Sequence, residues 1–175
     1  MEVISVDNVF LTTDINSIFQ YIFMKENERK WSINKHFWEE GLQNKSPGVV
    51  SVFVIEGNAK DIIESKLQKY LKPGEKIQSV QYYEWHQMSQ INWHNDSGKT
   101  ASITIYLNDT WDRDWGGFFC WKDENNQYHM HIPKFNSGII SRGNPEHHVS
   151  LVNPFAPVRK TLQIWITPGL NTIQE

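Results

Sequence analysis

The chain has almost no cysteine and no long hydrophobic run, and each absence excludes a class of protein. Its single cysteine, Cys120, cannot form an intramolecular disulfide or build a cluster of thiolate ligands. No stretch approaches the roughly 18 apolar residues of a membrane-spanning helix, so we expect no membrane association. If the chain binds a metal, histidines and carboxylates are the plentiful ligands, a set typical of iron rather than of thiolate-bound metals.

Basic stretches are also absent. The formal net charge is -3, and no block of lysines and arginines offers a surface for a phosphate backbone, so nucleic acid is not indicated as a partner. Met1-Glu2-Val3 lacks the basic flank and apolar core of a secretory leader, which predicts a cytoplasmic location. The oligomeric state cannot be predicted from these features.

The length of 175 residues fits a single domain over residues 1–175. Aromatic residues make up 13% of the chain and include eight tryptophans. Such a content is typical of a thick core or of a cavity lined with rings.

Helical patterns are confined to the first part of the chain. Apolar residues recur at helical spacing after Asp14, a good N-cap residue, and again within 58–71, before Pro73-Gly74. A β-branched run over 49–55 predicts one strand between these helices. We therefore expect residues 1–76 to provide mainly helical support.

After residue 77 the pattern changes to short strands separated by turn residues. The candidate strands are Ser79–Tyr83, Gln90–His94, Ala101–Leu107, Phe118–Trp121, Tyr128–Ile132, Gly138–Ser141, His147–Val152 and Lys160–Ile166. Eight short antiparallel strands favour a jelly roll. The predicted fold is α+β and mainly β: a double-stranded β-helix (jelly roll) over 77–168, with N-terminal helices packed on one sheet.

Two of these strands alternate polar and aliphatic residues. One face carries Ser102, Thr104, Tyr106 and Asn108; in the last strand one face carries Arg159, Thr161, Gln163 and Trp165. A polar face is solvated in a simple surface strand. Helices that cover the aliphatic faces would instead leave the polar faces inside the roll, where an arginine needs a counter-charge such as a bound dicarboxylate.

A candidate metal site lies at the end of the second strand. His94 and Asp96 are two residues apart and point to the same side of an extended chain, so both can reach one ion. His147, 53 residues further on, supplies a third ligand. Two histidines and one carboxylate leave positions open for a bidentate co-substrate and O2, as in non-haem iron oxygenases.

At this point the sequence resembles a known family. Residues 81–167 are similar to the prolyl-hydroxylase branch of the Fe(II)- and 2-oxoglutarate-dependent dioxygenases. The matching segments, in order, are His94-Asn95-Asp96, Ile105-Tyr106-Leu107-Asn108, Trp115-Gly116-Gly117, Pro133-Lys134-Phe135, His147-His148-Val149 and Arg159-Lys160-Thr161-Leu162.

The resemblance implies Fe(II), 2-oxoglutarate and O2 as cofactor and co-substrates, with His94, Asp96 and His147 as metal ligands and catalytic residues. It also implies that Arg159 pairs with the distal carboxylate of 2-oxoglutarate, that Tyr106 hydrogen-bonds the same group and that Trp165 packs nearby. Thr161, on the face of Arg159, is a further co-substrate candidate. Tyr83 is another, by analogy with a tyrosine upstream of the first ligand in relatives.

The chain departs from the family at two points. Arg159 follows His147 by twelve residues rather than about ten, which predicts a longer turn over 153–158. In the doublet His147-His148 either residue could be the ligand; the family pattern selects His147, and strand alternation then turns His148 away.

Three other residues have open roles. His129 and His131 form a second pair on one strand, but we expect no carboxylate in the same register, so surface or pocket positions are favoured. Arg142, shortly before His147, is expected to contact either a substrate or solvent. The tryptophan-rich segment 108–115 is predicted to be either a lid or a brace.

The resemblance implies a hydroxylase that inserts oxygen into a C–H bond and releases succinate and CO2. A related halogenase branch has a small residue in place of the carboxylate ligand, so Asp96 argues for hydroxylation. A peptidyl proline, an amino acid and a small metabolite are all open as substrates. The alternative function is a non-catalytic sensory module that binds 2-oxoglutarate and iron. A metalloenzyme of this fold that does not use 2-oxoglutarate would leave Arg159 and Tyr106 without a purpose.

Overall fold

The computed structural model describes residues 1–27, 32–33, 40–96 and 98–169. The helices are α1 (Thr12–Asn27), α2 (Glu40–Gln43) and α3 (Gly57–Leu67), with short 3-10 helices η2 (Gln68–Tyr70) and η3 (Arg113–Trp115). The strands are β1 (Glu2–Val6), β2 (Ser32–Ile33), β3 (Val50–Val54), β4 (Glu75–Trp85), β5 (Ile91–His94), β6 (Ala101–Tyr106), β7 (Phe119–Lys122), β8 (Tyr128–His131), β9 (Gly138–Arg142), β10 (His147–Val149) and β11 (Arg159–Pro168).

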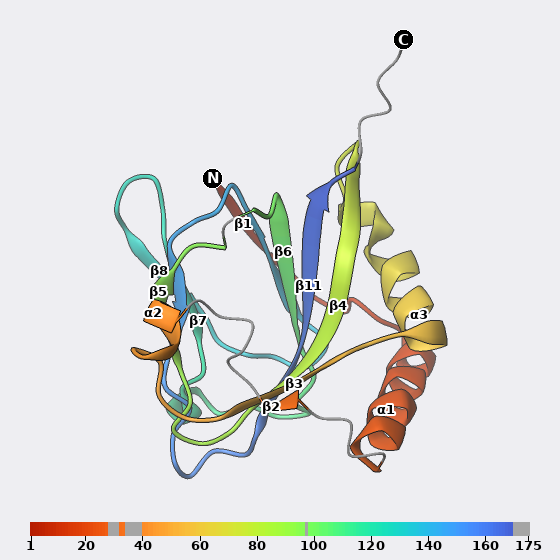
Figure 1. Cartoon of the computed structure of the whole chain (residues 1–175), viewed down its shortest axis with the longest axis horizontal. Coiled ribbons are helices and arrows are strands. Elements are labelled where there is room, and N and C mark those ends of the chain that lie inside the picture. Colours follow the sequence, from red (N-terminus) through yellow and green to blue (C-terminus); the bar gives the residue numbers. More distant parts are fainter. Residues whose placement is uncertain (28–31, 34–39, 97, 170–175) are drawn as a thin grey trace.

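The strands form two antiparallel sheets. The major sheet has the order β1-β9-β6-β11-β4-β3-β2, and the minor sheet has the order β5-β10-β7-β8. Figure 1 shows the minor sheet on one side of the major sheet and α1 and α3 on the other. The eight strands from β4 to β11 overlap the eight predicted segments, so the predicted jelly roll is confirmed.

Helices α1 and α3 cover the aliphatic face of the major sheet. Helix α1 buries Ile15, Ile18 and Ile22, and α3 buries Ala59, Ile63 and Leu67. These side chains share one core cluster with the aliphatic residues of β6 and β11, namely Ile103, Ile105, Leu162, Ile164 and Ile166. The polar faces of both strands are thereby turned toward the minor sheet, as predicted. Among the described residues, no helix is long and apolar enough to cross a membrane.

The N-terminal part of the chain is not only a helical support. Strand β1 pairs with β9, with Glu2 opposite Arg142 and Val6 opposite Gly138, and β3 pairs with β4. Strand β1 contains exposed and half-buried residues without strict alternation, a pattern too short to be identified beside the apolar runs that follow. Strand β1 is therefore an edge strand of the major sheet that was not predicted from the sequence.

The expectation that Arg142 contacts a substrate or solvent is wrong, because Arg142 is buried and lies outside the cavity lining. Its buried guanidinium forms an ion pair with Glu75 and donates to the carbonyl of Tyr70. Burial is the largest single influence and raises the pKa of Glu75, but the hydrogen bonds from Arg142 and the Lys72 backbone, together with the charges of both residues, outweigh it and lower the pKa. Arg142 therefore ties β9 to the start of β4, a contact between residues 67 positions apart.

Candidate functional site

His94, Asp96 and His147 meet between the ends of two minor-sheet strands. His94 ends β5, His147 begins β10, and the two residues are cross-strand partners with ring centroids 4.3 Å apart. Asp96 lies two residues beyond β5. Its Oδ1 is 3.6 Å from His94 Nε2 and its Oδ2 is 3.5 Å from His147 Nε2. One ligand atom from each residue lies within 4.8 Å of the other two.

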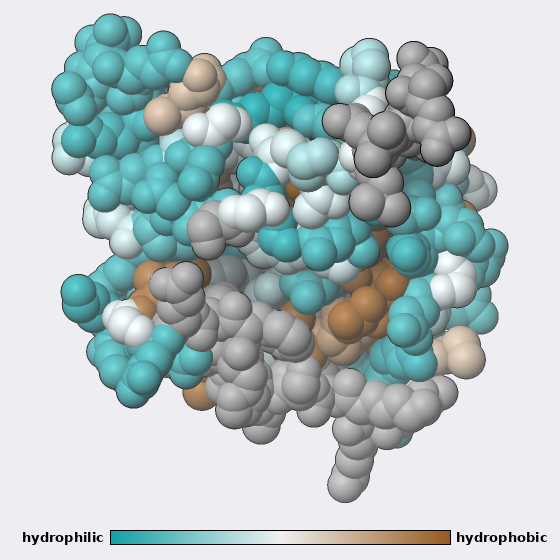
Figure 2. All heavy atoms as spheres, turned by 45° about the horizontal axis from the view of Figure 1, so that its top comes forward, coloured by the Kyte–Doolittle hydropathy of each residue, from teal (hydrophilic) through white to brown (hydrophobic). Residues whose placement is uncertain are grey.

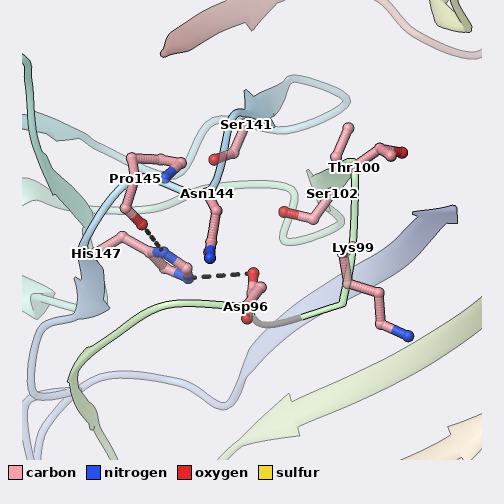
Figure 3. A pocket seen from close by; sticks show the side chains of 9 residues that line it. Asp96, Lys99, Thr100, Ser102, Ser141, Asn144, Pro145 and His147 are labelled. Carbon is pink, nitrogen blue, oxygen red and sulfur yellow. Dashed lines mark hydrogen bonds and ion pairs between the residues drawn. The ribbon is translucent and has the colours of Figure 1, made fainter. Parts of the chain in front are cut away.

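Both imidazoles are held in the same tautomer by the backbone. His94 Nδ1 is 2.7 Å from the carbonyl oxygen of Asn92, and His147 Nδ1 is 2.9 Å from that of Pro145. A carbonyl oxygen can only accept, so each Nδ1 carries the proton and each Nε2 presents a lone pair to Asp96. Figure 3 shows this arrangement for His147, with Pro145 on one side of the ring and Asp96 on the other.

These spacings fit a metal ion. Ligand atoms about 2.1 Å from a common ion are about 3.0 Å apart at a right angle and about 3.4 Å apart at a tetrahedral angle. The measured separations of 3.5 and 3.6 Å are only slightly wider. Burial lowers the pKa of His147, although the charge of Asp96 opposes the shift, so the ring is neutral at pH 7 and able to bind a cation. The three residues therefore form a candidate metal site.

His148 is turned out of this site. Its ring is 4.3 Å from that of Trp93, whereas His147 packs within 5.2 Å of the ring of Phe119. The alternation of β10 thus points the two histidines to opposite faces of the minor sheet, and only His147 lies within reach of Asp96.

A cavity of about 850 Å³ lies between the two sheets and includes the three candidate ligands in its lining. Its floor is the inner face of the major sheet, where side chains stand in rows across β4, β11 and β6. Thr161 of β11 is paired with Tyr83 on one side and Tyr106 on the other, and Arg159 is paired with Trp85. The size is ordinary for a pocket that holds a small molecule.

Arg159 lies at one end of this floor with unused hydrogen-bonding capacity. Its side chain is 1% exposed, and its charge faces the rings of Trp85 and Tyr106, at 5.3 and 5.2 Å. Arg159 Nε, Arg159 Nη2 and the Tyr106 hydroxyl have no partner with full hydrogen-bond geometry, although the guanidinium and the hydroxyl are close enough to interact with each other, and no carboxylate of the described residues lies within 4 Å of the guanidinium. An unpaired buried cation costs several kcal/mol. A bound carboxylate would satisfy all three atoms, so the pair fits the distal end of 2-oxoglutarate.

The protonation states of Tyr106 and Arg159 support their role as donors to a carboxylate. Burial raises the pKa of Tyr106 to about 12, although Arg159 opposes the rise, so the hydroxyl keeps its proton at neutral pH and can donate. Burial lowers the pKa of Arg159, and Tyr106 opposes that shift. Two neighbouring donors of this kind select an anion.

The side chains of two other co-substrate candidates, Tyr83 and Trp165, share one hydrogen-bond acceptor, Gln81. Tyr83 donates its proton to Gln81 Oε1 at 2.9 Å, and burial, followed by the charge of Asp96, raises its pKa. Trp165 Nε1 donates to the same oxygen at 2.9 Å. Trp165 is six residues from Arg159 along β11, which corresponds to roughly 20 Å of strand. Strand pairing therefore brings Tyr83, Thr161 and Tyr106 beside Arg159, whereas the backbone of Trp165 lies toward the other end of the floor and its ring reaches back to Gln81.

The tryptophan-rich segment 108–115 is a brace rather than a lid. Trp111 donates to the carbonyl of Gly116 at 2.9 Å and meets Trp115 edge to face. Both rings pack against a core cluster that includes Tyr83 and Trp85. The segment thus supports the end of the cavity at which Arg159 lies.

Gly117 leaves room for Arg159, and this predicts an effect of adding one methyl group. A Cβ at Gly117 would lie 2.7 Å from Cδ of Arg159 and 3.3 Å from Cζ2 of Trp111. We expect Gly117→Ala to displace the guanidinium and to weaken 2-oxoglutarate binding by about tenfold or more, since misplacements near 1 Å have large effects. Calorimetric titration of the Mn(II)-loaded protein with 2-oxoglutarate measures this.

Gly74→Ala is the matched control. Gly117 and Gly74 both have positive φ, +64° and +79°, but a Cβ at Gly74 meets nothing within 4 Å. Both variants carry backbone strain of about 1–2 kcal/mol. Equal affinities of the two variants for 2-oxoglutarate would contradict the steric explanation.

The second histidine pair differs from expectation at one position. His129 does have a carboxylate partner, because its Nε2 is 2.8 Å from Oδ2 of Asp123 in the hairpin turn before β8. Asp123 lies in the turn, six positions from His129, so strand alternation does not identify it as a partner. His131 stacks on Tyr106 at 5.3 Å, and its Nδ1 is 3.2 Å from the hydroxyl of Ser5. It supports the Tyr106 ring, a role that depends on the unpredicted strand β1.

The chain belongs to the 2OG-Fe(II) oxygenase superfamily, whose model matches residues 76–167, more than half of the sequence. This family uses Fe(II), 2-oxoglutarate and O2, and the His94, Asp96 and His147 cluster is its candidate iron site in this chain. The resemblance inferred from the sequence motifs is therefore confirmed.

Solved structures place the chain among prolyl hydroxylases and related enzymes in fold. A prolyl hydroxylase from Trichoplax adhaerens, in complex with a peptide of hypoxia inducible factor, is 15% identical with a TM-score of 0.77; 95% of this chain and 83% of that chain are covered. A prolyl-4-hydroxylase from Pseudomonas putida is 13% identical with a TM-score of 0.71, covering 95% and 92%. HygX from Streptomyces hygroscopicus, with nickel, 2-oxoglutarate and hygromycin B bound, is 10% identical with a TM-score of 0.63, covering 96% and 83%. No curated protein matches the sequence.

Proposed function

We propose that the protein is an Fe(II)- and 2-oxoglutarate-dependent hydroxylase. It would insert one oxygen atom of O2 into a C–H bond of a peptidyl proline, an amino acid or a small metabolite, and release succinate and CO2. The iron, with its co-substrates, supplies this oxidative chemistry, and the chain supplies ligands, orientation and a cavity that limits access of water.

Each candidate residue has a role in this proposal. His94, Asp96 and His147 hold the iron through two imidazole nitrogens and one carboxylate. Arg159 and Tyr106 bind the distal carboxylate of 2-oxoglutarate. Three further residues line the path between them and beyond, with Thr161 and Tyr83 near Arg159 and Trp165 toward the opposite end.

One observation carries the proposal: two kinds of unsatisfied groups share one cavity. Three ligand atoms converge without a common partner, and Arg159, which lines the same cavity with the Tyr106 ring beside it, presents donors that no carboxylate of the described residues satisfies. A metal-binding module without 2-oxoglutarate has no use for the second set. Asp96 supports hydroxylation, because it occupies the ligand position that a halide requires in the halogenase branch.

The substrate class is not decided by the fold. The Trichoplax enzyme is complexed with a peptide and HygX with hygromycin B, so similar folds accept a peptide or a small molecule. Fold likeness alone cannot choose between them.

The test is turnover of the Fe(II)-loaded protein with isotopically heavy O2. Proline peptides, free amino acids and small metabolites are supplied one at a time, and succinate and product masses are recorded. We expect one compound to gain a single heavy oxygen in step with succinate. Binding of iron and 2-oxoglutarate without succinate formation for any compound would favour the sensory module, and failure to bind either would reject both functions.

A further inference from the structure

A second cation lies at the opposite end of the cavity floor from Arg159. Lys99 follows Asp96 by three residues and, together with Trp165 and Gln78, belongs to the cavity lining. Figure 3 shows its side chain leaving the loop in a direction away from Asp96. Its amino group donates to Gln78 Oε1 in β4 and lies 5.9 Å from the ring centroid of Trp165 in β11. The lysine is thus held over the floor by neutral groups.

Lys99 has no carboxylate partner among the described residues. Lys60, Lys66, Lys72, Lys134 and Lys160 each have a carboxylate within 4 Å, and Lys99 differs from the other lysines without one because it belongs to the cavity lining. Among the described residues that line the cavity, the charged groups other than histidine are Arg159, Lys99 and Asp96. The cavity therefore has an excess of positive charge before any ligand binds.

If the proposed function holds, the charges in the cavity leave Lys99 free to interact with the substrate. Fe(II) adds two positive charges and 2-oxoglutarate two negative ones, so the lining residues together with these ligands keep one positive charge. Arg159 is used by the co-substrate, and Asp96 by the iron. Lys99 remains as the free cation, on the side of the iron ligands away from Arg159.

We propose that Lys99 binds a carboxylate of the substrate, so that the oxidised carbon belongs to a molecule or segment bearing a carboxylate close to the reacting position. Asp96 and Lys99 line the same cavity, so one substrate molecule or peptide segment can reach both the iron site and the lysine. Figure 2 turns this end of the roll toward the viewer, and hydrophilic residues cover most of the surface drawn in colour.

The experiment compares each carboxylate with its neutral amide. Probes are the free amino acids and their α-carboxamides, and proline peptides with aspartate or asparagine beside the proline; succinate formation is measured with each. We expect carboxylates to be preferred over amides by about tenfold or more, as for hydrogen bonds to charged groups. The free amino acids and the peptides distinguish an α-carboxylate from an acidic side chain as the source of the anion.

Variants connect this preference to the lysine. Lys99→Met should remove the preference for carboxylates over amides and raise the KM of the carboxylate probe, whereas Lys99→Arg should retain most of that preference. Lys76→Met, a change at an exposed residue of β4, should leave the preference unchanged. The affinity for 2-oxoglutarate, measured by calorimetry with Mn(II), should stay within about twofold in Lys99→Met because Arg159 lies at the other end of the floor.

The outcomes separate this inference from the proposed function. Preference for neutral or cationic probes, stimulation by no probe, or a preference that survives in Lys99→Met would overturn the role of Lys99. In each of these cases, normal binding of Mn(II) and 2-oxoglutarate would still support the proposed co-substrate site. Loss of that binding in the unmodified protein would instead reject the proposed function itself.

Discussion

Asp96→Ala is expected to abolish 2-oxoglutarate turnover while leaving the fold intact. The carboxylate is the one anionic member of the candidate iron site and lies 3.5–3.6 Å from both imidazole nitrogens. Its loss leaves two neutral ligands, so we expect Mn(II) affinity to fall by at least about a hundredfold, because even outer-shell changes at metal sites cost tenfold to a hundredfold. Succinate formation should fall at least as far. Calorimetry with Mn(II) and the visible absorption of anaerobic Fe(II) with 2-oxoglutarate measure binding without turnover.

Two further variants make this result specific. Asp96→Asn keeps the shape of the side chain but not its charge, and should lose nearly as much metal affinity. Asp109→Ala removes an exposed carboxylate at the edge of the tryptophan-rich segment and should change nothing. Retention of tight metal binding in Asp96→Ala would show that the cluster of His94, Asp96 and His147 is not the iron site.

Arg159→Met should weaken 2-oxoglutarate binding by about a hundredfold, because the co-substrate loses two charge-assisted hydrogen bonds at its distal carboxylate. The same variant should not destabilise the ligand-free protein. Methionine removes a buried charge that has no carboxylate partner among the described residues, so its melting temperature is expected to equal or exceed that of the unmodified chain. Metal affinity should be unchanged, since Arg159 is no part of the ligand cluster.

Thermal unfolding with and without ligand distinguishes these effects. Saturating Mn(II) and 2-oxoglutarate should raise the melting temperature of the unmodified protein. A ligand present at a hundred times its Kd stabilises the folded state by about 2.7 kcal/mol. Arg159→Met should show little of the increase that is due to 2-oxoglutarate. Lys160→Met changes the neighbouring cation on the other face of β11 and serves as the control. A large drop in the stability of ligand-free Arg159→Met would indicate that the arginine is structural.

The part of the site that could be predicted from sequence is the part set by strand alternation. His94 and Asp96 lie two residues apart, and Arg159 and Thr161 share a face of β11, so the chain itself decides their direction. The family pattern selected His147 over its neighbour, and alternation then turned His148 away. These local relations also gave the eight strands of the roll and the two helices that cover the major sheet.

Relations between distant residues could not be predicted in this way. The ion pair of Arg142 joins residues far apart in the chain, and the support of Tyr106 by His131 depends on β1 reaching β9. Trp165 shares a face with Arg159, yet the strand carries it to the other end of the cavity. Alternation gives the direction of a side chain but not its position along the cavity, and it leaves out Lys99, which lies in a loop.

The central position of β11 has a consequence for how the chain folds. This strand, near the end of the sequence, lies between β4 and β6, so the major sheet has no continuous middle until residues 159–168 have been inserted. The pairs β1–β9 and β4–β11 join segments separated by more than 70 residues. Closing such long loops before any pairing energy is gained makes folding slow, and refolding on the millisecond-to-second scale of other non-local β proteins is expected. A ribosome-bound chain that lacks its last strand would hold His94, Asp96 and His147 without the floor beneath them, so iron loading is expected to follow synthesis.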